Sequence, residues 1–369
     1  MGRTGLAHLP LHGGKAPKWL FTRMVALSKS IMEVMLMEFG TDMVLTRLSD
    51  PYWFQALSCV LGYDWHSSGT TTVTCGALKE AIDPETHGIA FCGGKGAASR
   101  RTLDDIVSAC SCFNVSTETI DRFRYASRMT AKVDSSAIQD EYSLYHHVFF
   151  FSEKKKWAVI QQGMNTHTQY ARRYHWSSEH LNGFLNEPHQ GILSAEKREQ
   201  SLDMTARVSE ASQKISVDLI NDNPYHLRTC FAQLQLPSTQ VTLDNLERVD
   251  NKTVKTLDMP RFIDWEKLRE LYEFQPKNYE ELLSCKGIGP STVRALALVS
   301  DLIFGEPPSW EDPVKYSFTV GGKDGVPFPV DRKAMDDTIF CINQGIHEAV
   351  VGNKEKMGAF RALSSFIPN

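Results

Sequence analysis

The sequence predicts an α+β protein that is mostly α-helical, with a β-hairpin or small sheet in its N-terminal half and an all-helical C-terminal half. The β signal lies at residues 143–162, where the aromatic and β-branched runs LYHHVFFF and KWAVIQQ flank a charged turn and predict a hairpin. From residue 195 onward the pattern is long, charged and helical. Because 369 residues is long for one domain, we expect a mixed α/β domain over residues 1–205 and a helical domain over residues 206–369.

Helix start and stop signals place the first elements in order. Residues 1–18 are rich in Gly, His and Pro and are expected to form a loop. An amphipathic helix should follow and end at Gly40, and the pair Asp50-Pro51 should start the next helix. The glycine-rich string GIAFCGGKGAASR is interpreted as a loop. The expected helices cover residues 19–39, 51–62, 76–82 and 102–111.

Composition narrows the function classes. Hydrophobic content of 42% and charged content of 23% are typical of a soluble globular protein. The net charge of −4 means that a nucleic-acid-binding protein of this composition must gather its Lys and Arg locally. Eight cysteines without a CxxC pair predict reduced thiols in the cytoplasm and specify no zinc ribbon or iron–sulfur cluster. The N-terminus lacks a signal-peptide core, and the most apolar run contains Lys29 and Glu33, so we expect no membrane span.

The most informative stretch is residues 278–305, NYEELLSCKGIGPSTVRALALVSDLIFG, which predicts a helix, a tight turn and a second helix. Asn278 can cap the first helix, with Glu281 at the reciprocal capping position. Gly287 and Gly289 permit backbone angles that side chains would forbid. Pro290 opens the second helix at the position where its missing N–H costs nothing.

This turn has the chemistry of a phosphate site. A Gly-x-Gly turn that opens a helix leaves backbone N–H groups unpaired, with the positive end of the helix dipole behind them. The stretch resembles the helix-hairpin-helix element that grips the DNA backbone without reading sequence, and the alternative is an ordinary helical hairpin. The predicted DNA-binding residues here are Lys286, Gly287, Gly289, Ser291, Thr292 and Arg294.

Residues 260–345 resemble the helix-hairpin-helix DNA glycosylase superfamily in the order of hairpin, helix and a Val-Asp pair followed by a further helix. The resemblance implies that Asp331 is the catalytic carboxylate. The segment between Gly289 and Asp331 is longer than in that family, and Ser291 stands where strand-cleaving members carry a lysine. A Schiff-base lyase step at position 291 is therefore excluded. The alternative role for Asp331 is to cap the helix that follows it.

Nearly the whole chain also resembles a bacterial and archaeal family catalogued as a domain of unknown function, number 763. The matching strings are LPLHGGKAP, LSDPYWFQAL, LGYDWHSSGTTT, YHHVFFF, WAVIQQGMN and GGKDGVPFPVDR. For such a family we expect an enzyme that cuts DNA at altered bases.

The tripeptide Gly-Gly-Lys occurs three times and ends at Lys15, Lys95 and Lys323. Consecutive glycines can expose backbone amides to an anion, with the lysine as a point charge. Lys95 and Lys323 are therefore candidate DNA contacts. The alternative is three unrelated turns whose lysines are solvated.

A loop after the second expected helix contains Asp64, His66 and the hydroxyl groups of residues 67–72. A carboxylate and an imidazole together suit proton transfer near neutral pH. With His12 and Lys15 they could form the site of a phosphodiester-cleaving or lyase reaction, and the alternative is a hydrogen-bonded structural loop. These residues are compatible with a divalent metal but specify none, and no other cofactor is predicted.

Basic and aromatic side chains alternate in residues 170–176, YARRYHW. Arg172 and Arg173 could contact DNA, and Tyr174 and Trp176 could stack on an extruded base. The alternative is a strand with one face in the core.

Three functions remain open from the sequence. The protein could be an enzyme acting on an altered base, with Asp331 as its carboxylate, or a nuclease whose chemistry lies in the N-terminal half. In the nuclease, Lys15 and His66 would be the first candidates for the groups that cleave the strand. The third function is non-catalytic DNA binding. In all three the expected partner is DNA, contacted through its backbone independently of sequence.

Overall fold

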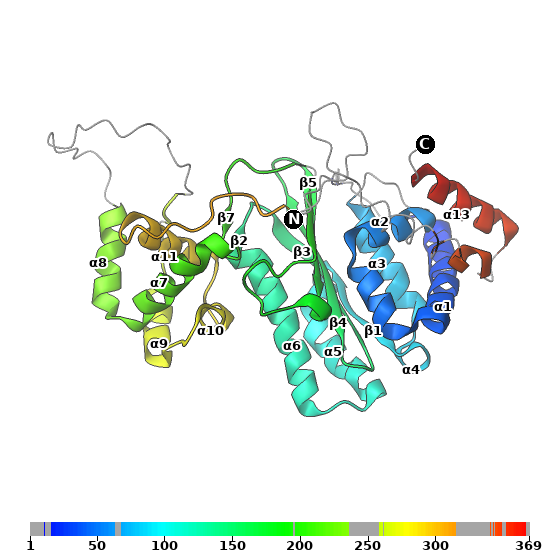
Figure 1. The fold of residues 1–369 in the computed structure, drawn as a ribbon, viewed down its shortest axis with the longest axis horizontal. Helices are drawn as coiled ribbons and strands as arrows, with labels where there is room; N and C mark the ends of the chain where they lie inside the picture. Colours follow the sequence, from blue (N-terminus) through cyan, green and yellow to red (C-terminus); the bar gives the residue numbers. More distant parts are fainter. Residues whose placement is uncertain are drawn as a thin grey trace.

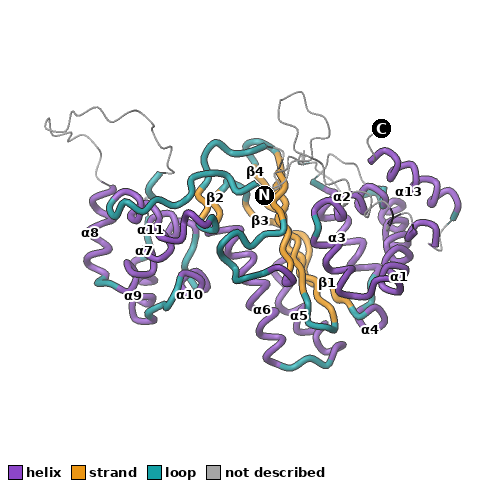
Figure 2. Tube along the Cα trace, viewed as in Figure 1, coloured by secondary structure: helices purple, strands orange, loops and turns teal. Residues whose placement is uncertain are grey.

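The centre of the molecule is a five-stranded antiparallel sheet with helices packed on both faces (Figure 1, Figure 2). Helices make up most of the regular structure, which confirms the predicted α+β, mostly α class. The computed structural model describes residues 11, 16–62, 68–194, 196–235, 258–260, 262–314, 340, 342, 344–348 and 352–366.

The sheet has the strand order β1-β3-β4-β5-β6. The predicted hairpin over residues 143–162 is confirmed as β3 and β4, which pair antiparallel. A separate two-stranded sheet joins β2 (Ile138–Gln139) to β7 (Leu202–Asp203). The strands of the main sheet are β1 (Ile89–Lys95), β3 (Ser143–Ser152), β4 (Trp157–Asn165), β5 (Tyr170–Ser177) and β6 (Gly191–Ser194).

Strand β1 corrects the expectation of a loop at GIAFCGGKGAASR. Ile89–Lys95 pairs along its whole length with β3, and its apolar side chains alternate between the two faces of the sheet. Gly93 has a φ of +95°, and a Cβ atom there would lie 2.3 Å from the carbonyl oxygen of His147. The glycine therefore permits a close approach of two strands, which sequence reasoning mistook for the sign of a loop.

One face of the sheet is covered by the N-terminal helices. Val148, Phe150 and Ile160 of the sheet share a hydrophobic core with α1 (Lys18–Ser49), α2 (Pro51–Val60) and α3 (Gly69–Ala81). The helix expected to end at Gly40 continues to Ser49 as α1. Gly40 has a φ of 75° and a ψ of 173° and kinks the helix instead of ending it. The short helix α4 (Pro84–His87) leads into β1.

The other face is covered by α5 (Thr102–Cys110) and α6 (Thr117–Lys132), and α6 was not predicted. The helical run expected from residue 195 begins only at Glu210, because the strand β7 comes first. The remaining helices on this side share the same core but pack against α6 and the residues after it instead of the sheet (Figure 1); they are α7 (Glu210–Asn221), α8 (Pro224–Gln235), α9 (Trp265–Phe274), α10 (Tyr279–Ser284) and α11 (Pro290–Leu302).

The C-terminal helix α13 (Asn353–Phe366) lies beside α2, on the opposite side of the sheet from α7–α11 (Figure 1). Ile342, Ile346 and Ala359 belong to the hydrophobic core of α1–α3. The expected domain boundary at residue 205 falls between β7 and α7. The helices after this boundary lie on both sides of the sheet, α7–α11 on one side and α13 on the other. No helix in the described parts of the chain combines the length and apolar character of a membrane span.

Candidate nucleic-acid interface and polar clusters of the sheet

The helix, turn and helix predicted for residues 278–305 are present as α10, a turn at residues 285–289, and α11. Asn278 caps α10, since its side chain accepts a hydrogen bond from the amide of Glu281 at 2.9 Å. Pro290 occupies the first turn of α11. Gly287 has a φ of +94°, whereas Gly289 is extended, with φ −127° and ψ −177°. The left-handed position is therefore Gly287, and Gly289 caps α11.

Neighbouring elements hold the turn in place. The ammonium group of Lys132, at the end of α6, donates to the carbonyl oxygen of Ile288. Gln139 of β2 donates to the carbonyl oxygen of Pro290 at 2.8 Å and accepts from Nε of Arg294 at 2.8 Å. These contacts come from residues about 150 positions away in the chain, as their separations of 156, 151 and 155 show. The turn is thus supported from outside its own two helices.

The outer surface of the turn is accessible and carries positive charge. Lys286, Gly287 and Ser291 are exposed. The amides of Gly289, Ser291 and Thr292 donate no hydrogen bond to any residue that the structure describes. Lys286 likewise has no ion-pair partner among those residues. The combination of free amides, a helix N-terminus and a cation suits a phosphate group.

Arg128 is a basic residue beside the turn that sequence reasoning missed. Tyr125, Arg128 and Lys132 follow one another at helical spacing along one face of α6. Tyr125 donates to Glu280 of α10 at 2.8 Å, and Lys132 contacts the turn, so the exposed Arg128 lies along the same contact face. The spacing was readable in the sequence, but the packing of α6 against α10 was not.

Two predicted contacts of the turn need correction. The side chain of Thr292 is buried and faces the core, because it lies on the inner side of the first turn of α11. Arg294 is half-buried and bound to Gln139, so its guanidinium positions the turn against β2.

The prediction that Arg172, Tyr174 and Trp176 contact DNA was wrong. These side chains lie on one face of β5 and are fully buried. The Arg172 guanidinium donates to Asp140 at 2.8 Å and to both oxygens of Asp312, at 3.0 and 2.7 Å. The Tyr174 hydroxyl donates to Asp140 at 2.7 Å, and the Trp176 indole donates to Asp134 at 3.0 Å. The basic and aromatic pattern belongs to an interior strand, and the donors named here pair inside the protein.

Arg173 points to the opposite face and is also fully buried, so the prediction that it contacts DNA at the surface was wrong as well. Its Nε donates to Thr71 Oγ1 and its Nη2 to Gln55 Oε1, both at 2.8 Å. The guanidinium lies 5.0 Å from the ring centroid of Phe54. Burial lowers the pKa of Arg173 to about 10.

Lys95, His146, Gln162 and Arg173 lie side by side across four strands, and we call them the Lys95–Arg173 row. The register pairs Lys95 with His146, His146 with Gln162, and Gln162 with Arg173. Gln162 donates to the Ser68 carbonyl oxygen at 2.8 Å and to the Tyr145 hydroxyl. Lys95 is exposed, and its ammonium lies 5.7 Å from the Tyr145 ring centroid. The aromatic and β-branched run LYHHVFFF predicted the strand β3, but the row itself depends on the pairing of β1 with β3 and of β4 with β5.

A second polar chain runs through the other side of the sheet. Ser127 Oγ lies 2.9 Å from Nε2 of His147, whose Nδ1 lies 2.8 Å from Gln161 Oε1. Gln161 donates to Asp134 at 2.5 Å, and Asp134 lies 2.5 Å from Nε2 of His189. Burial lowers the pKa of His147 to about 4, so its imidazole is neutral at pH 7. All five side chains are buried, and the chain therefore serves as a satisfied interior network.

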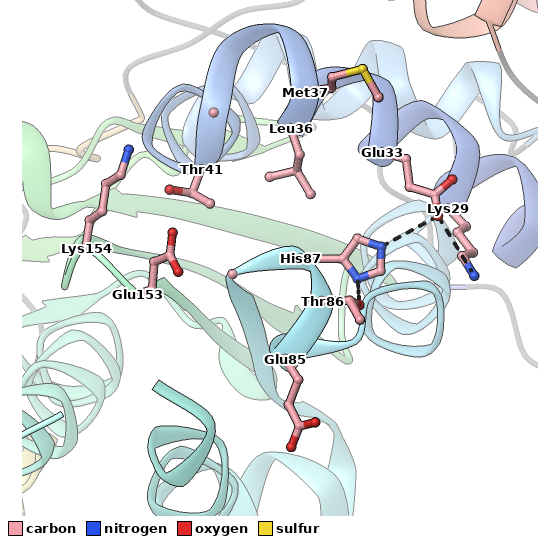
Figure 3. Close-up of a pocket in the computed structure, with 12 residues that line it drawn as sticks. Lys29, Glu33, Leu36, Met37, Thr41, Glu85, Thr86, His87, Glu153 and Lys154 are labelled. Carbon is pink, nitrogen blue, oxygen red and sulfur yellow. Dashed lines mark hydrogen bonds and ion pairs between the residues drawn. The ribbon is translucent and has the colours of Figure 1, made fainter. Parts of the chain in front are cut away.

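A surface groove of about 760 Å³ lies between α1, α4 and the β3–β4 turn (Figure 3). The carboxylate of Glu33 lies 3.8 Å from His87 Nε2 and 3.9 Å from Lys29 Nζ. The groove includes Gly88, which precedes β1, and therefore lies at the end of that strand opposite Lys95. Glu33 thus pairs with both His87 and Lys29, and no predicted site residue lines the groove.

Five predicted residues lie outside the described residues: Asp331, Lys15, Asp64, His66 and Lys323. Their roles stay predictions from the sequence, as does a metal site that uses His12. Within the described residues, no group of three His, Cys, Asp or Glu side chains could hold a metal ion.

Comparison with known proteins identifies the family of this chain. No curated protein and no solved structure matches the chain. A family model described as a protein of unknown function (DUF763) matches residues 5–330, which is most of its length. The chain therefore belongs to the DUF763 family.

Proposed function

We propose that this protein is an enzyme that binds DNA through its backbone, without reading sequence, and acts on altered bases. The observation that carries the DNA-binding part is the exposed turn at residues 285–289. The free amides at the start of α11 and the charge of Lys286 are groups that bind phosphate oxygens.

The rigidity of the turn supports this role. Lys132 and Gln139 bind its carbonyl oxygens from outside, so the amides on its other side have a defined direction before any ligand arrives. Preorganised donors lose less conformational entropy on binding than donors on a loop that must first be ordered. Arg128 extends the positive charge along α6.

The catalytic part of the proposal rests on the sequence. The order of turn, helix and Val-Asp resembles the helix-hairpin-helix glycosylases and makes Asp331 the candidate carboxylate. A carboxylate in such a site stabilises positive charge on the sugar or activates water. Because Ser291 replaces the lysine of strand-cleaving members, cleavage of the strand would need other residues.

A second candidate function is a nuclease whose chemistry lies in the N-terminal half, and the Lys95–Arg173 row favours it. The row places a lysine, a histidine and an arginine on one face of the sheet. Lys15, Asp64 and His66 would be its sequence-predicted partners.

DNA binding is tested by fluorescence anisotropy with a labelled duplex over a series of salt concentrations. Each neutralised phosphate contributes about −0.9 to the slope of log K against log salt. Lys286→Ala should therefore make the slope shallower by about one. Lys154→Ala, an exposed lysine in the β3–β4 turn, is the matched control and should leave the slope unchanged. Equal slopes for all three proteins would contradict a contact by the turn.

The reaction is tested by incubating the protein with duplexes that carry different altered bases, with and without EDTA. A glycosylase leaves an abasic site in an intact strand, a nuclease leaves a nick, and a non-catalytic protein leaves neither. Asp331→Asn removes the charge but keeps a helix-capping side chain. We expect it to bind DNA and to lose at least about a hundredfold in rate. Normal turnover by Asp331→Asn would contradict the glycosylase-like mechanism and favour the second candidate.

A further inference from the structure

Arg173 carries a buried charge that no described carboxylate neutralises. Its partners are the neutral oxygens of Thr71 and Gln55 and the ring of Phe54. Its chain neighbour Arg172 is buried to the same extent and is bound by two carboxylates. Buried charges in proteins are normally paired, because an unpaired ion inside a protein costs several kcal/mol. The contrast between two adjacent arginines marks Arg173 as the unusual one.

Other donors of the same row also lack partners. Nη1 of Arg173 and both ring nitrogens of the buried His146 form no hydrogen bond with the described part of the protein. Nearly all buried polar groups have a partner, and the exceptions call for an explanation such as a bound ion. Three such unpaired atoms therefore belong to the row that carries the unneutralised charge.

The strand register brings these groups together. Adjacent strands are about 4.8 Å apart, so the Lys95–Arg173 row spans about 15 Å on one face of the sheet. Lys95 and Tyr145 form its accessible end, and Arg173 its buried end. Burial lowers the pKa of His146 to about 3, and the nearby charges of Lys95 and Arg173 lower it further. The imidazole is thus neutral and has one N–H to donate, in surroundings of positive potential.

We propose that the Lys95–Arg173 row binds an oxyanion of phosphate size, either inorganic phosphate or the terminal phosphate group of a nucleic acid. The guanidinium fork of Arg173 would donate from Nη1, and Lys95 would supply a charge at the accessible end. His146 would donate its single N–H. Guanidinium groups match the geometry of phosphate oxygens, and such charge-assisted bonds are the stronger ones in proteins. The site shares no residue with the turn at residues 285–289 and does not depend on DNA binding there.

Phosphate binding is tested by thermal unfolding and calorimetry of the whole protein in sodium phosphate and in sodium chloride of equal ionic strength. Phosphate should raise the Tm of the wild-type protein, because a ligand that binds only the folded state stabilises it. Lys95→Ala should bind phosphate at least about tenfold more weakly. Lys154→Ala, in the turn at the far end of β3, should bind it as the wild type does.

Further variants and ligands complete the test. Arg173→Lys keeps the charge but removes the guanidinium fork, and it should weaken phosphate binding. If Arg173→Lys fails to fold, the phosphate affinity of Lys95→Ala tests the proposal. A 5′-phosphorylated oligonucleotide that binds more tightly than its 5′-hydroxyl counterpart would identify a nucleic-acid phosphate, and binding of inorganic phosphate alone would identify the free ion. An unchanged Tm in phosphate would contradict the proposal. Equal loss of binding in Lys95→Ala and Lys154→Ala would also contradict it.

Discussion

Asp312 joins three separate segments of the chain through one carboxylate. It accepts from both terminal nitrogens of Arg172 in β5, from the amide of Arg198 at 2.6 Å, and from the amide of Val314 at 3.0 Å. The carboxylate is fully buried. A single side chain thus holds the segment that follows α11 against the sheet.

Asp312→Ala should lower the free energy of unfolding by about 3–5 kcal/mol, because it leaves Arg172 underneutralised and the amides of Arg198 and Val314 unpaired. The neighbouring Glu311→Ala is the control, since that side chain is exposed and should change stability by no more than about 0.5 kcal/mol. Urea unfolding monitored by circular dichroism measures both. Similar values for the two variants would show that the buried pair does not stabilise the fold.

At the scale of elements, the turn between α10 and α11 contains two glycines with different tasks. Gly287 has a positive φ, and a Cβ atom there would lie 2.7 Å from Cδ of Lys267. The lysine side chain can move aside, so the backbone conformation sets most of the cost. Gly289 is extended, and a Cβ atom there would meet nothing within 4 Å. Gly287 therefore serves the shape of the turn, and Gly289 leaves its outer surface open.

Gly287→Ala should destabilise the protein by about 1–2 kcal/mol, the usual cost of a left-handed conformation with a side chain. Gly289→Ala should cost no more than about 1 kcal/mol of stability, because alanine is a poorer N-cap residue than glycine. It should weaken DNA binding, because the added methyl group keeps a phosphate away from the amides. Gly358→Ala, in α13 and also without neighbours within 4 Å, controls for the extra methyl group. Urea unfolding measures the stability of each variant, and fluorescence anisotropy with a labelled duplex measures its DNA binding. Undiminished DNA binding by Gly289→Ala would make the turn a purely structural feature.

At the scale of the whole molecule, the sheet buries neutral histidines between its helical layers. Burial lowers the pKa of His146 to about 3 and that of His147 to about 4, and it places the pKa of His175 well below its ordinary value. In the unfolded chain these imidazoles take up protons below about pH 6.5. Between about pH 6.5 and 4 the unfolded state therefore binds more protons than the folded state. Asp134, whose pKa is raised by burial, acts in the opposite direction.

We expect the free energy of unfolding to fall as the pH is lowered from about 6.5 towards 4, by up to about 1.4 kcal/mol per pH unit for each histidine. Urea midpoints at pH 7, 6 and 5 measure this dependence. His147→Gln, which keeps a hydrogen-bonding side chain, should make the dependence shallower. A stability that stays constant between pH 7 and 5 would contradict the neutral state of these histidines.

Interactions between near neighbours in the chain determined what the sequence alone could predict. The aromatic and β-branched runs that flank a charged turn in residues 143–162 specified the β3–β4 hairpin, and Asn278 and Pro290 specified the start of α10 and α11. Such signals depend on caps, turn residues and periodicity within a few positions. The accessible face of the turn, with Lys286 and Gly289, followed from the same local chemistry.

Only the tertiary structure decided which polar side chains are buried and with what they pair. Arg172 and Arg173 are adjacent in sequence, yet one is neutralised by Asp312, 140 positions away, and the other is bound to Gln55, 118 positions away. No local pattern distinguishes the two, because a strand covered on both faces buries every side chain that it carries. Contacts between distant segments also explain why Lys132 and Gln139 support the turn and why α13 packs on α2. Burial and charge pairing arise when distant segments of the chain come together, so they exist only in the folded protein.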